Sequence, residues 1–515
     1  MRRNGVKMKR CGGVLMHISS VPGKYGIGTL GEEAYRFADF LSECGFGAWQ
    51  VLPICPCDGY NSPYSGSSAF AGNVFLIDPE LLFKDGLITG EELEACACGD
   101  IYSTLYDFLR ESRPKVFRKA FSRADSALLD EVRSFMQNER GIYDYAFFCA
   151  LKEHFGGRAW YEWADGLKFR EKSAMEAAEH ELGDEILYHA FLQYEFYRQW
   201  SLLKKHANEK GVGIIGDMPI YLSRDSAEVW ANPKLFSLNG DMELVKCAGV
   251  PPDYFCTDGQ KWGNPLYDWA ELEADGYSLW IDRLRAAEKH FDAVRIDHFR
   301  AFASYWEIPA DKSAKCGSWV KGPGMKFFDE VKKQCPGLEI IAEDLGEIDD
   351  DVRTLLKKTG FPGMGVMQFA FISDDDSTHL PHNYSTKTIG YTGTHDNNTI
   401  LGWLWESDES SRRYALDYCG FSGDWGEGGP HSGVIRSIIR TLWRSSAICA
   451  IVPVQDLCGF GGDTRMNRPG VAGGNWEFRL TESAMGDIDG EFYKGLNRLY
   501  KRGAMKNFGK EIGNV

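Results

Sequence analysis

Short apolar segments of this chain end in acidic residues that could carry out acid–base or nucleophilic chemistry. One β-branched run places Arg295 between Val294 and Ile296 and closes with Asp297. Because side chains alternate along a strand, Arg295 and Asp297 share one face. Burying such charges is costly unless they are paired or used in function. A structural ion pair and a functional one are equally consistent with this triplet alone.

The same pattern recurs along the chain, which favours a functional interpretation. Asp217 closes a second apolar run, Glu343 and Asp344 close a third, and His395 and Asp396 close a fourth. Acidic residues at the carboxyl ends of parallel strands, with helices between the strands, are typical of the active site of a (β/α)8 barrel. The sequence therefore predicts an α/β protein of the TIM-barrel class.

Eight short apolar segments of the sequence are predicted to be β-strands. They fall at residues 13–18, 48–53, 213–221, 293–296, 338–345, 364–369, 388–394 and 448–454, with helices expected at 31–44, 192–210, 327–334 and 350–359. We expect residues 1–515 to form a single catalytic barrel unit.

Two long excursions interrupt the predicted barrel. Residues 80–210 are rich in good helix formers, which predicts a mainly helical insertion after the second strand. Residues 222–284 form a second insertion, where Pro251 and Pro252 hold two aromatic residues on a stiffened loop. A Gly/Pro/Ser-rich loop at 58–73 also follows the second strand, and a loop of this length at a catalytic face is usually functional.

Composition excludes several classes of function. The formal charge of -16 argues against nucleic acid or an anionic membrane as a partner and fits a neutral substrate such as a sugar. The 14 cysteines are scattered without zinc-like spacing, so reduced thiols in a cytoplasmic enzyme are expected. Neither a signal peptide nor a membrane-spanning run is evident, and we expect neither a metal nor a cofactor.

Several ungapped blocks resemble a known family. Asp217-Met218-Pro219, Arg295 to Arg300, Ala342 to Gly346 and Thr392 to Asn397 look like the signature blocks of α-amylase-type barrels. Ser62-Pro63-Tyr64, Val250 to Phe255, Trp262 to Pro265 and Arg465-Met466-Asn467 narrow the resemblance to the 4-α-glucanotransferases called amylomaltase or disproportionating enzyme. The similarity extends from about Gly13 to about Arg479.

The resemblance implies roles for three carboxylates: Asp297 as nucleophile, Glu343 as acid/base and Asp396 as stabiliser of the distorted sugar. Exchange of an α-1,4 bond with retention needs two carboxyl groups about 5–5.5 Å apart. Arg295 should keep Asp297 ionised, whereas Glu343 must start protonated. His298 and His395 are placed to bind sugar hydroxyls, but as single histidines either could equally have a structural role. The expected substrate-binding residues are Tyr60, Ser62, Tyr64, Asp217, Asp253, Tyr254, Phe255, Trp262, Asn264, Arg295, His298, His395 and Asn467.

Three functions remain in order of preference. The first is a 4-α-glucanotransferase that disproportionates maltooligosaccharides and α-1,4-glucans, with glucose as an acceptor. A retaining α-glucan hydrolase would share all three carboxylates, and only an acceptor platform at Tyr254 and Phe255 argues against it. A non-catalytic glucan-binding barrel is a remote third alternative.

Overall fold

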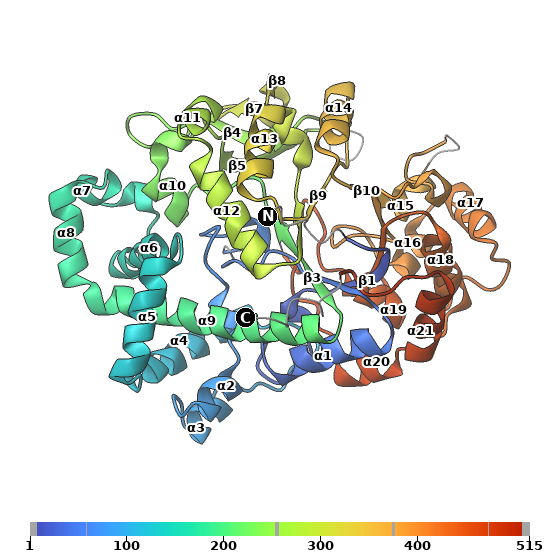
Figure 1. The fold of residues 1–515 in the computed structure, drawn as a ribbon, viewed down its shortest axis with the longest axis horizontal. Helices are drawn as coiled ribbons and strands as arrows, with labels where there is room; N and C mark the ends of the chain where they lie inside the picture. The colour runs from blue at the N-terminus through green and yellow to red at the C-terminus, as the bar shows by residue number, and fades with distance from the viewer. Residues whose placement is uncertain (1–7, 58, 253–256, 373–375, 472, 507–515) are drawn as a thin grey trace, which may run out of the picture.

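A central parallel sheet organises the structure, a computed structural model that describes residues 8–57, 59–252, 257–372, 376–471 and 473–506 (Figure 1). Its eight strands run in the order β10-β11-β12-β1-β2-β3-β6-β9. All eight predicted strands are confirmed; β6 has the predicted bounds, β1 and β10 begin earlier than predicted, and the other five are shorter. The bounds are β1 Cys11–Leu15, β2 Ala48–Gln50, β3 Gly213–Met218, β6 Ala293–Ile296, β9 Ile340–Ala342, β10 Gly363–Val366, β11 Thr388–Tyr391 and β12 Cys449–Pro453.

The two edge strands of this sheet meet and form a (β/α)8 barrel. The Ala342 N–H of β9 donates to Pro362 O at 2.9 Å, just before β10. The Met364 N–H of β10 donates to Asp344 Oδ1 at 2.6 Å. Nearly every strand residue is buried, because helices cover the outside and side chains fill the inside. The carboxyl ends of all eight strands therefore share one face.

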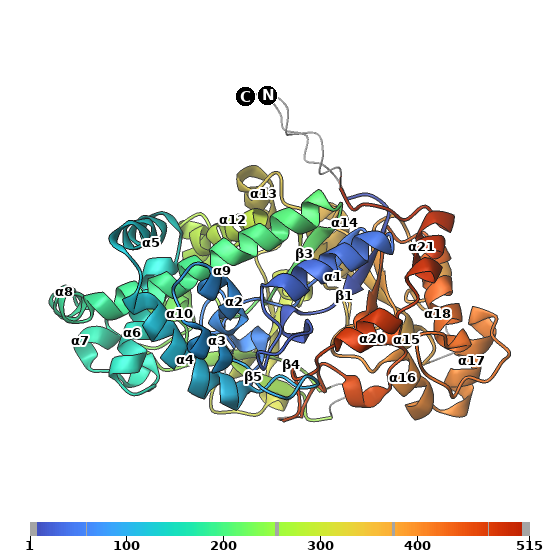
Figure 2. The same ribbon diagram turned by 90° about the horizontal axis from the view of Figure 1, so that it is seen from below.

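The segment between β2 and β3 is mainly helical. Its last helix, α9 (Gly183–Glu209), begins nine residues before the expected start at Leu192 and returns along α1 (Glu32–Glu43) (Figure 2). The rings of Tyr35 and His206 lie 4.9 Å apart between these two helices. The other helices of this segment are α2 Pro79–Lys84, α3 Gly90–Glu94, α4 Tyr106–Ser122, α5 Ser126–Asn138, α6 Ile142–His154, α7 Asp165–Lys168 and α8 Lys172–Glu181.

A second sheet was not predicted from the sequence. It is antiparallel, in the order β5-β4-β7-β8, and it combines the excursion after β3 with the segment after β6. Trp262 to Pro265 belong to β5, and the excursion ends in the barrel helix α12. The elements are α10 Ala227–Ala231, β4 Lys246–Val250, β5 Gln260–Pro265, α11 Trp269–Ala274, α12 Ser278–His290, β7 Ser304–Pro309 and β8 Ser318–Lys321.

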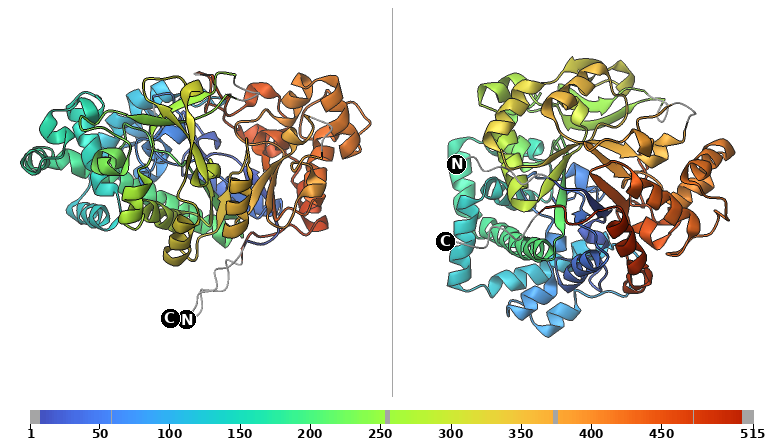
Figure 3. Two further views of the ribbon diagram at one scale, coloured as in Figure 1. Left: turned by 90° about the horizontal axis from the view of Figure 1, so that it is seen from above. Right: turned by 45° about the vertical axis from the view of Figure 1, so that its right-hand side comes forward.

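The remaining helices complete the wall of the barrel and its carboxyl-terminal flank. Figure 3 shows the insertion between β2 and β3 on one side of the molecule and α15–α18 on the opposite side. The expected helices at 327–334 and 350–359 are confirmed as α13 and α14. The bounds are α13 Met325–Gln334, α14 Asp350–Thr359, α15 Met367–Ala370, α16 Ile400–Glu406, α17 Glu409–Cys419, α18 Gly433–Arg444, α19 Val454–Cys458, α20 Glu482–Asp487 and α21 Gly490–Leu499.

A search of the described residues finds no helix that combines the length and the apolarity needed to cross a membrane.

Candidate active site

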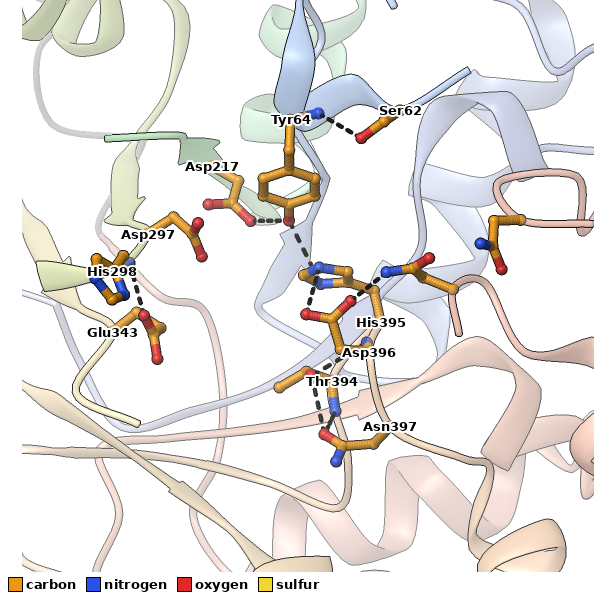
Figure 4. Close-up of polar contacts among 12 residues, drawn as sticks. Ser62, Tyr64, Asp217, Asp297, His298, Glu343, Thr394, His395, Asp396 and Asn397 are labelled. Atoms are coloured by element: carbon orange, nitrogen blue, oxygen red, sulfur yellow. Dashed lines mark hydrogen bonds and ion pairs between the residues drawn. The ribbon is translucent and has the colours of Figure 1, made fainter. Parts of the chain in front are cut away.

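Four strands deliver their acidic residues to one region at the carboxyl end of the barrel. Asp217 lies in β3, Asp297 follows β6, Glu343 follows β9 and Asp396 follows β11. Figure 4 shows Asp297 and Glu343 on one side and Asp396 with His395 on the other, with Asp217 and Tyr64 between them. The structure therefore gathers the three carboxylates predicted to be catalytic.

Arg295 connects two of these acidic residues. In the parallel pairing of β3 with β6, Asp217 is the register partner of Arg295. The Arg295 guanidinium donates to Asp217 Oδ1 and Oδ2 at 2.8 and 2.7 Å and to Asp297 Oδ1 at 2.7 Å. Asp217 is fully buried while the Asp297 side chain is 29% exposed. The cation thus fixes one oxygen of Asp297 and leaves its carboxylate open to the cleft.

Glu343 lies in a different electrostatic environment. Burial raises the pKa of Glu343 to about 8, and the negative charge of Asp297 adds to the effect. The backbone N–H groups of His298 and Leu345 donate to its two oxygens at 2.6 and 2.9 Å, which orients the carboxyl group. An acid whose pKa is near 8 holds its proton at neutral pH. Glu343 can therefore donate a proton beside the carboxyl group of Asp297.

Asp396 is held in its ionised form. Burial alone would raise the pKa of Asp396, but His395 and the amide of Asn467 outweigh it and lower the pKa to about 2. His395 Nε2 lies 3.3 Å from Asp396 Oδ2, and Asn467 Nδ2 donates to Asp396 Oδ1 at 2.6 Å. Arg465 donates to the Asp396 carbonyl at 3.0 Å. Asp396 is thus a fixed negative charge that faces the site.

Tyr64 contacts both Asp217 and His395, the residue that pairs with Asp396. Its hydroxyl donates to Asp217 Oδ2 at 2.7 Å, and its ring stacks on His395 with centroids 4.9 Å apart. The Ser62 hydroxyl accepts the Tyr64 N–H at 3.3 Å as the cap of a short helical turn. Ser62 therefore orients Tyr64 through its backbone (Figure 4). Tyr60 lies on the surface of the same loop and is 71% exposed.

His298 and Trp262 form the opposite wall. His298 has a left-handed backbone (φ 52°), and its ring meets Trp262 edge-on at 5.1 Å. Burial lowers the pKa of His298 to about 4, so the ring is neutral and can exchange hydrogen bonds with hydroxyl groups. Trp262 is 38% exposed. Asn264 donates to the Leu222 carbonyl at 2.9 Å, which ties β5 to the end of β3.

Three further residues of the prediction, Asp253, Tyr254 and Phe255, lie outside the described residues.

Some residues of the site were not among the predicted ones. Trp476 packs against both Tyr64 and His395, with ring centroids 5.8 and 5.9 Å away. Its backbone is left-handed (φ 67°), and its side chain is buried. The run Gly473-Gly474-Asn475 before Trp476 predicts a turn. No local pattern, however, predicts which strand end Trp476 packs against. Asn397 and Arg465 were also not predicted: Asn397 Oδ1 accepts from the Thr394 N–H and hydroxyl at 2.8 and 2.9 Å, and Arg465 holds the Asp396 carbonyl.

Among the described residues, one group of side chains could hold a metal ion, and it is remote from the carboxylates. It comprises Glu153, Glu185 and His189 in the helical insertion. Arg118 already pairs with both glutamates, at 2.7 and 2.5 Å, which supplies the positive charge that a metal would bring.

The fold and the site together define a barrel enzyme of the type that breaks and remakes glycosidic bonds with two carboxyl groups. The family model described as 4-alpha-glucanotransferase matches residues 16–484. The chain belongs to this 4-alpha-glucanotransferase family.

Two curated relatives and one solved structure illustrate the relationship. The 4-alpha-glucanotransferase of Streptococcus pneumoniae serotype 4 is 42% identical over 503 residues, which cover 96% of this chain and 98% of the relative. That of Thermus thermophilus is 42% identical over 502 residues, covering 96% and 100%. The amylomaltase from Streptococcus agalactiae in complex with acarbose superposes with a TM-score of 0.92 at 41% identity, covering 96% and 100%.

Proposed function

We propose that this chain is one catalytic unit that cleaves α-1,4-glucan bonds with retention and transfers the glucan segment to the 4-hydroxyl of another glucan or of glucose. The assignment of roles rests on the different environments of Asp297 and Glu343. The Arg295 guanidinium donates a hydrogen bond to Asp297, while Glu343 has a pKa of about 8. A nucleophile and an acid side by side are what a double displacement requires.

In the first step, Asp297 attacks the anomeric carbon, and Glu343 protonates the oxygen of the departing sugar. Asp396, His395 and Tyr64 bind the sugar ring that becomes distorted. The fixed charge of Asp396, with its pKa of about 2, stabilises positive charge that develops on the ring. The glucan is then an ester of Asp297.

Formation of the ester also prepares the second step. Esterified Asp297 no longer carries the negative charge that helps to raise the pKa of Glu343. The pKa of Glu343 therefore falls, and the carboxylate can take the proton of the incoming hydroxyl. One residue thus serves as acid and then as base.

Transfer competes with hydrolysis at this ester. A sugar that is bound and oriented reacts faster than water because its attack is effectively intramolecular. The exposed face of Trp262 beside His298 supports an acceptor site at this wall. We assign Asp253, Tyr254 and Phe255 to the same acceptor site from the sequence alone. Maltooligosaccharides are the proposed donors, and the chemistry uses neither a metal nor a cofactor.

A product analysis on maltotriose tests the proposal. Transfer yields glucose and longer oligosaccharides with no net gain of reducing ends. Glucose and maltose with an equivalent gain of reducing ends would instead identify a hydrolase, and unchanged maltotriose would identify a binding protein.

A further inference from the structure

A small cavity lies behind the loop that carries His395 and Asp396. Its volume is about 20 Å³, and its walls come from the ends of β1, β11 and β12. The polar residues in its lining include His17, His395, Asn398, Gln455 and Arg465. A cavity needs about 10–15 Å³ on this measure to hold one water molecule. The space therefore accommodates a single water.

Three lining residues each have a buried polar atom with no hydrogen-bond partner in the described part of the chain. These atoms are His17 Nδ1, Asn398 Nδ2 and Arg465 Nε. His17 and Asn398 are only 6% and 7% exposed. A buried polar atom left unpaired costs about 1–3 kcal/mol, and native proteins satisfy nearly all such atoms with protein or ordered water.

The three atoms match the bonding capacity of water. Burial, and after it the charge of His395, lowers the pKa of His17 to about 3, so its ring is neutral. A neutral imidazole nitrogen can accept a hydrogen bond, whereas Asn398 Nδ2 and Arg465 Nε can only donate. A water that accepts from Asn398 and Arg465 and donates to His17 satisfies all three.

We propose that this cavity binds one structural water, and that His17 uses it to position the loop of His395 and Asp396. Asp456 fixes the two ends of this loop directly, accepting from the Thr392 hydroxyl at 2.9 Å and from the Ile400 N–H at 2.7 Å. Arg465 contacts the Asp396 carbonyl. The water holds the loop at Asn398, between these fixed points and next to the segment that carries His395 and Asp396, so His17 is a positioning residue that does not touch substrate.

The first test is crystallographic and independent of the proposed function. A high-resolution structure of the full chain should show one density peak within hydrogen-bonding distance of His17 Nδ1, Asn398 Nδ2 and Arg465 Nε. The His17→Leu variant removes the acceptor and should lose this peak. The His17→Asn variant places its side-chain oxygen near the position of Nδ1 and should keep it. A dry cavity in the unaltered protein would overturn the proposal.

The second test is kinetic, and it rests on the proposed transferase activity. In maltotriose disproportionation, His17→Leu should lower kcat about tenfold, since small displacements of catalytic groups cost this much or more, while KM changes less than twofold. His17→Asn should restore most of the rate. His290→Leu is the matched control, because His290 is another buried histidine, with a pKa lowered to about 3 by burial, and its ring stacks on Tyr197 of α9.

The control should lower Tm while kcat stays unchanged. If His17→Asn is as slow as His17→Leu, or if both variants lose Tm but not kcat, the positioning role is wrong. Hydrolysis instead of transfer in every variant would contradict the proposed function and leave the water site standing.

Discussion

Arg295 and Asp217 are register partners on adjacent strands, and the guanidinium binds both oxygens of this fully buried carboxylate. The same guanidinium reaches Asp297 at 2.7 Å. Burial would lower the pKa of Arg295, but the two aspartates outweigh it and raise the pKa well above its usual value. Asp217 therefore fixes the charged guanidinium of Arg295 in position beside Asp297, the proposed nucleophile.

Replacing Asp297 should abolish turnover without unfolding the protein. Asp297→Ala removes the nucleophile, so transfer from maltotriose should fall by about 10⁴-fold or more. Because Asp217 still pairs with Arg295, no buried cation is left alone, and Tm should change by only a few degrees. Rates from initial glucose release and Tm from calorimetry check this. A folded variant with near-normal rates would refute the role of Asp297.

The pH profile should report the raised pKa of Glu343. As an acid Glu343 must be protonated, so activity on natural glucans should fall as pH rises through about 8. The profile of kcat/KM for maltotriose between pH 5 and 10 measures this limb. A carboxyl group with the ordinary value of 4.5 would already have lost its proton across that range. A basic limb that persists unchanged in Glu343→Gln would assign it to another group.

The leaving group should decide how severe the loss of Glu343 is. Glu343→Gln should slow transfer from maltotriose by about 10²–10⁴-fold, the usual contribution of a general acid. A glycosyl fluoride needs no protonation to depart, so formation of the ester from it should be affected far less. Stopped-flow release of fluoride measures this step on the glycosyl fluoride, and initial release of glucose measures it on maltotriose. Equal losses on both would mean that Glu343 does not act as an acid.

Trp262 should influence the choice between transfer and hydrolysis. Trp262→Ala leaves the three carboxylates in place but removes an aromatic contact of about 1 kcal/mol with the acceptor, equivalent to about fivefold in relative rate. The ratio of new reducing ends to glucose released from maltotriose should rise accordingly. Trp319→Ala, which removes another partly exposed tryptophan, serves as the control. An unchanged ratio in Trp262→Ala would place the acceptor site elsewhere.

Removal of divalent metals should leave both activity and stability unchanged. In the group of Glu153, Glu185 and His189, both glutamates already form ion pairs with Arg118. Dialysis against a chelator, followed by the maltotriose assay and calorimetry, measures the effect. Loss of activity on dialysis and its recovery on addition of calcium alone would reveal a functional metal site.

The sequence alone was enough to predict the barrel, because each strand is recognisable from a local run of residues. A buried strand leaves a short β-rich run, and a carboxylate at its end remains visible whatever the distant parts of the chain do. Alternation along one strand was likewise enough to place Arg295 and Asp297 on one face. The same pattern located Glu343 and Asp396, and the family resemblance then implied their roles.

Only the tertiary structure decided which groups meet across the barrel. The strand register placed Asp217 opposite Arg295, and the strand order β11-β12-β1-β2 brought the loop of Tyr64 close to His395, where Trp476 also packs. In the antiparallel sheet that holds Trp262, β4 pairs directly with β7, although the barrel strand β6 lies between them in the sequence. Such pairings join residues far apart in the chain, and their geometry follows from hydrogen-bond register and packing, which local periodicity does not encode. The chemistry of each residue was thus readable in the sequence, and its partners were set by the fold.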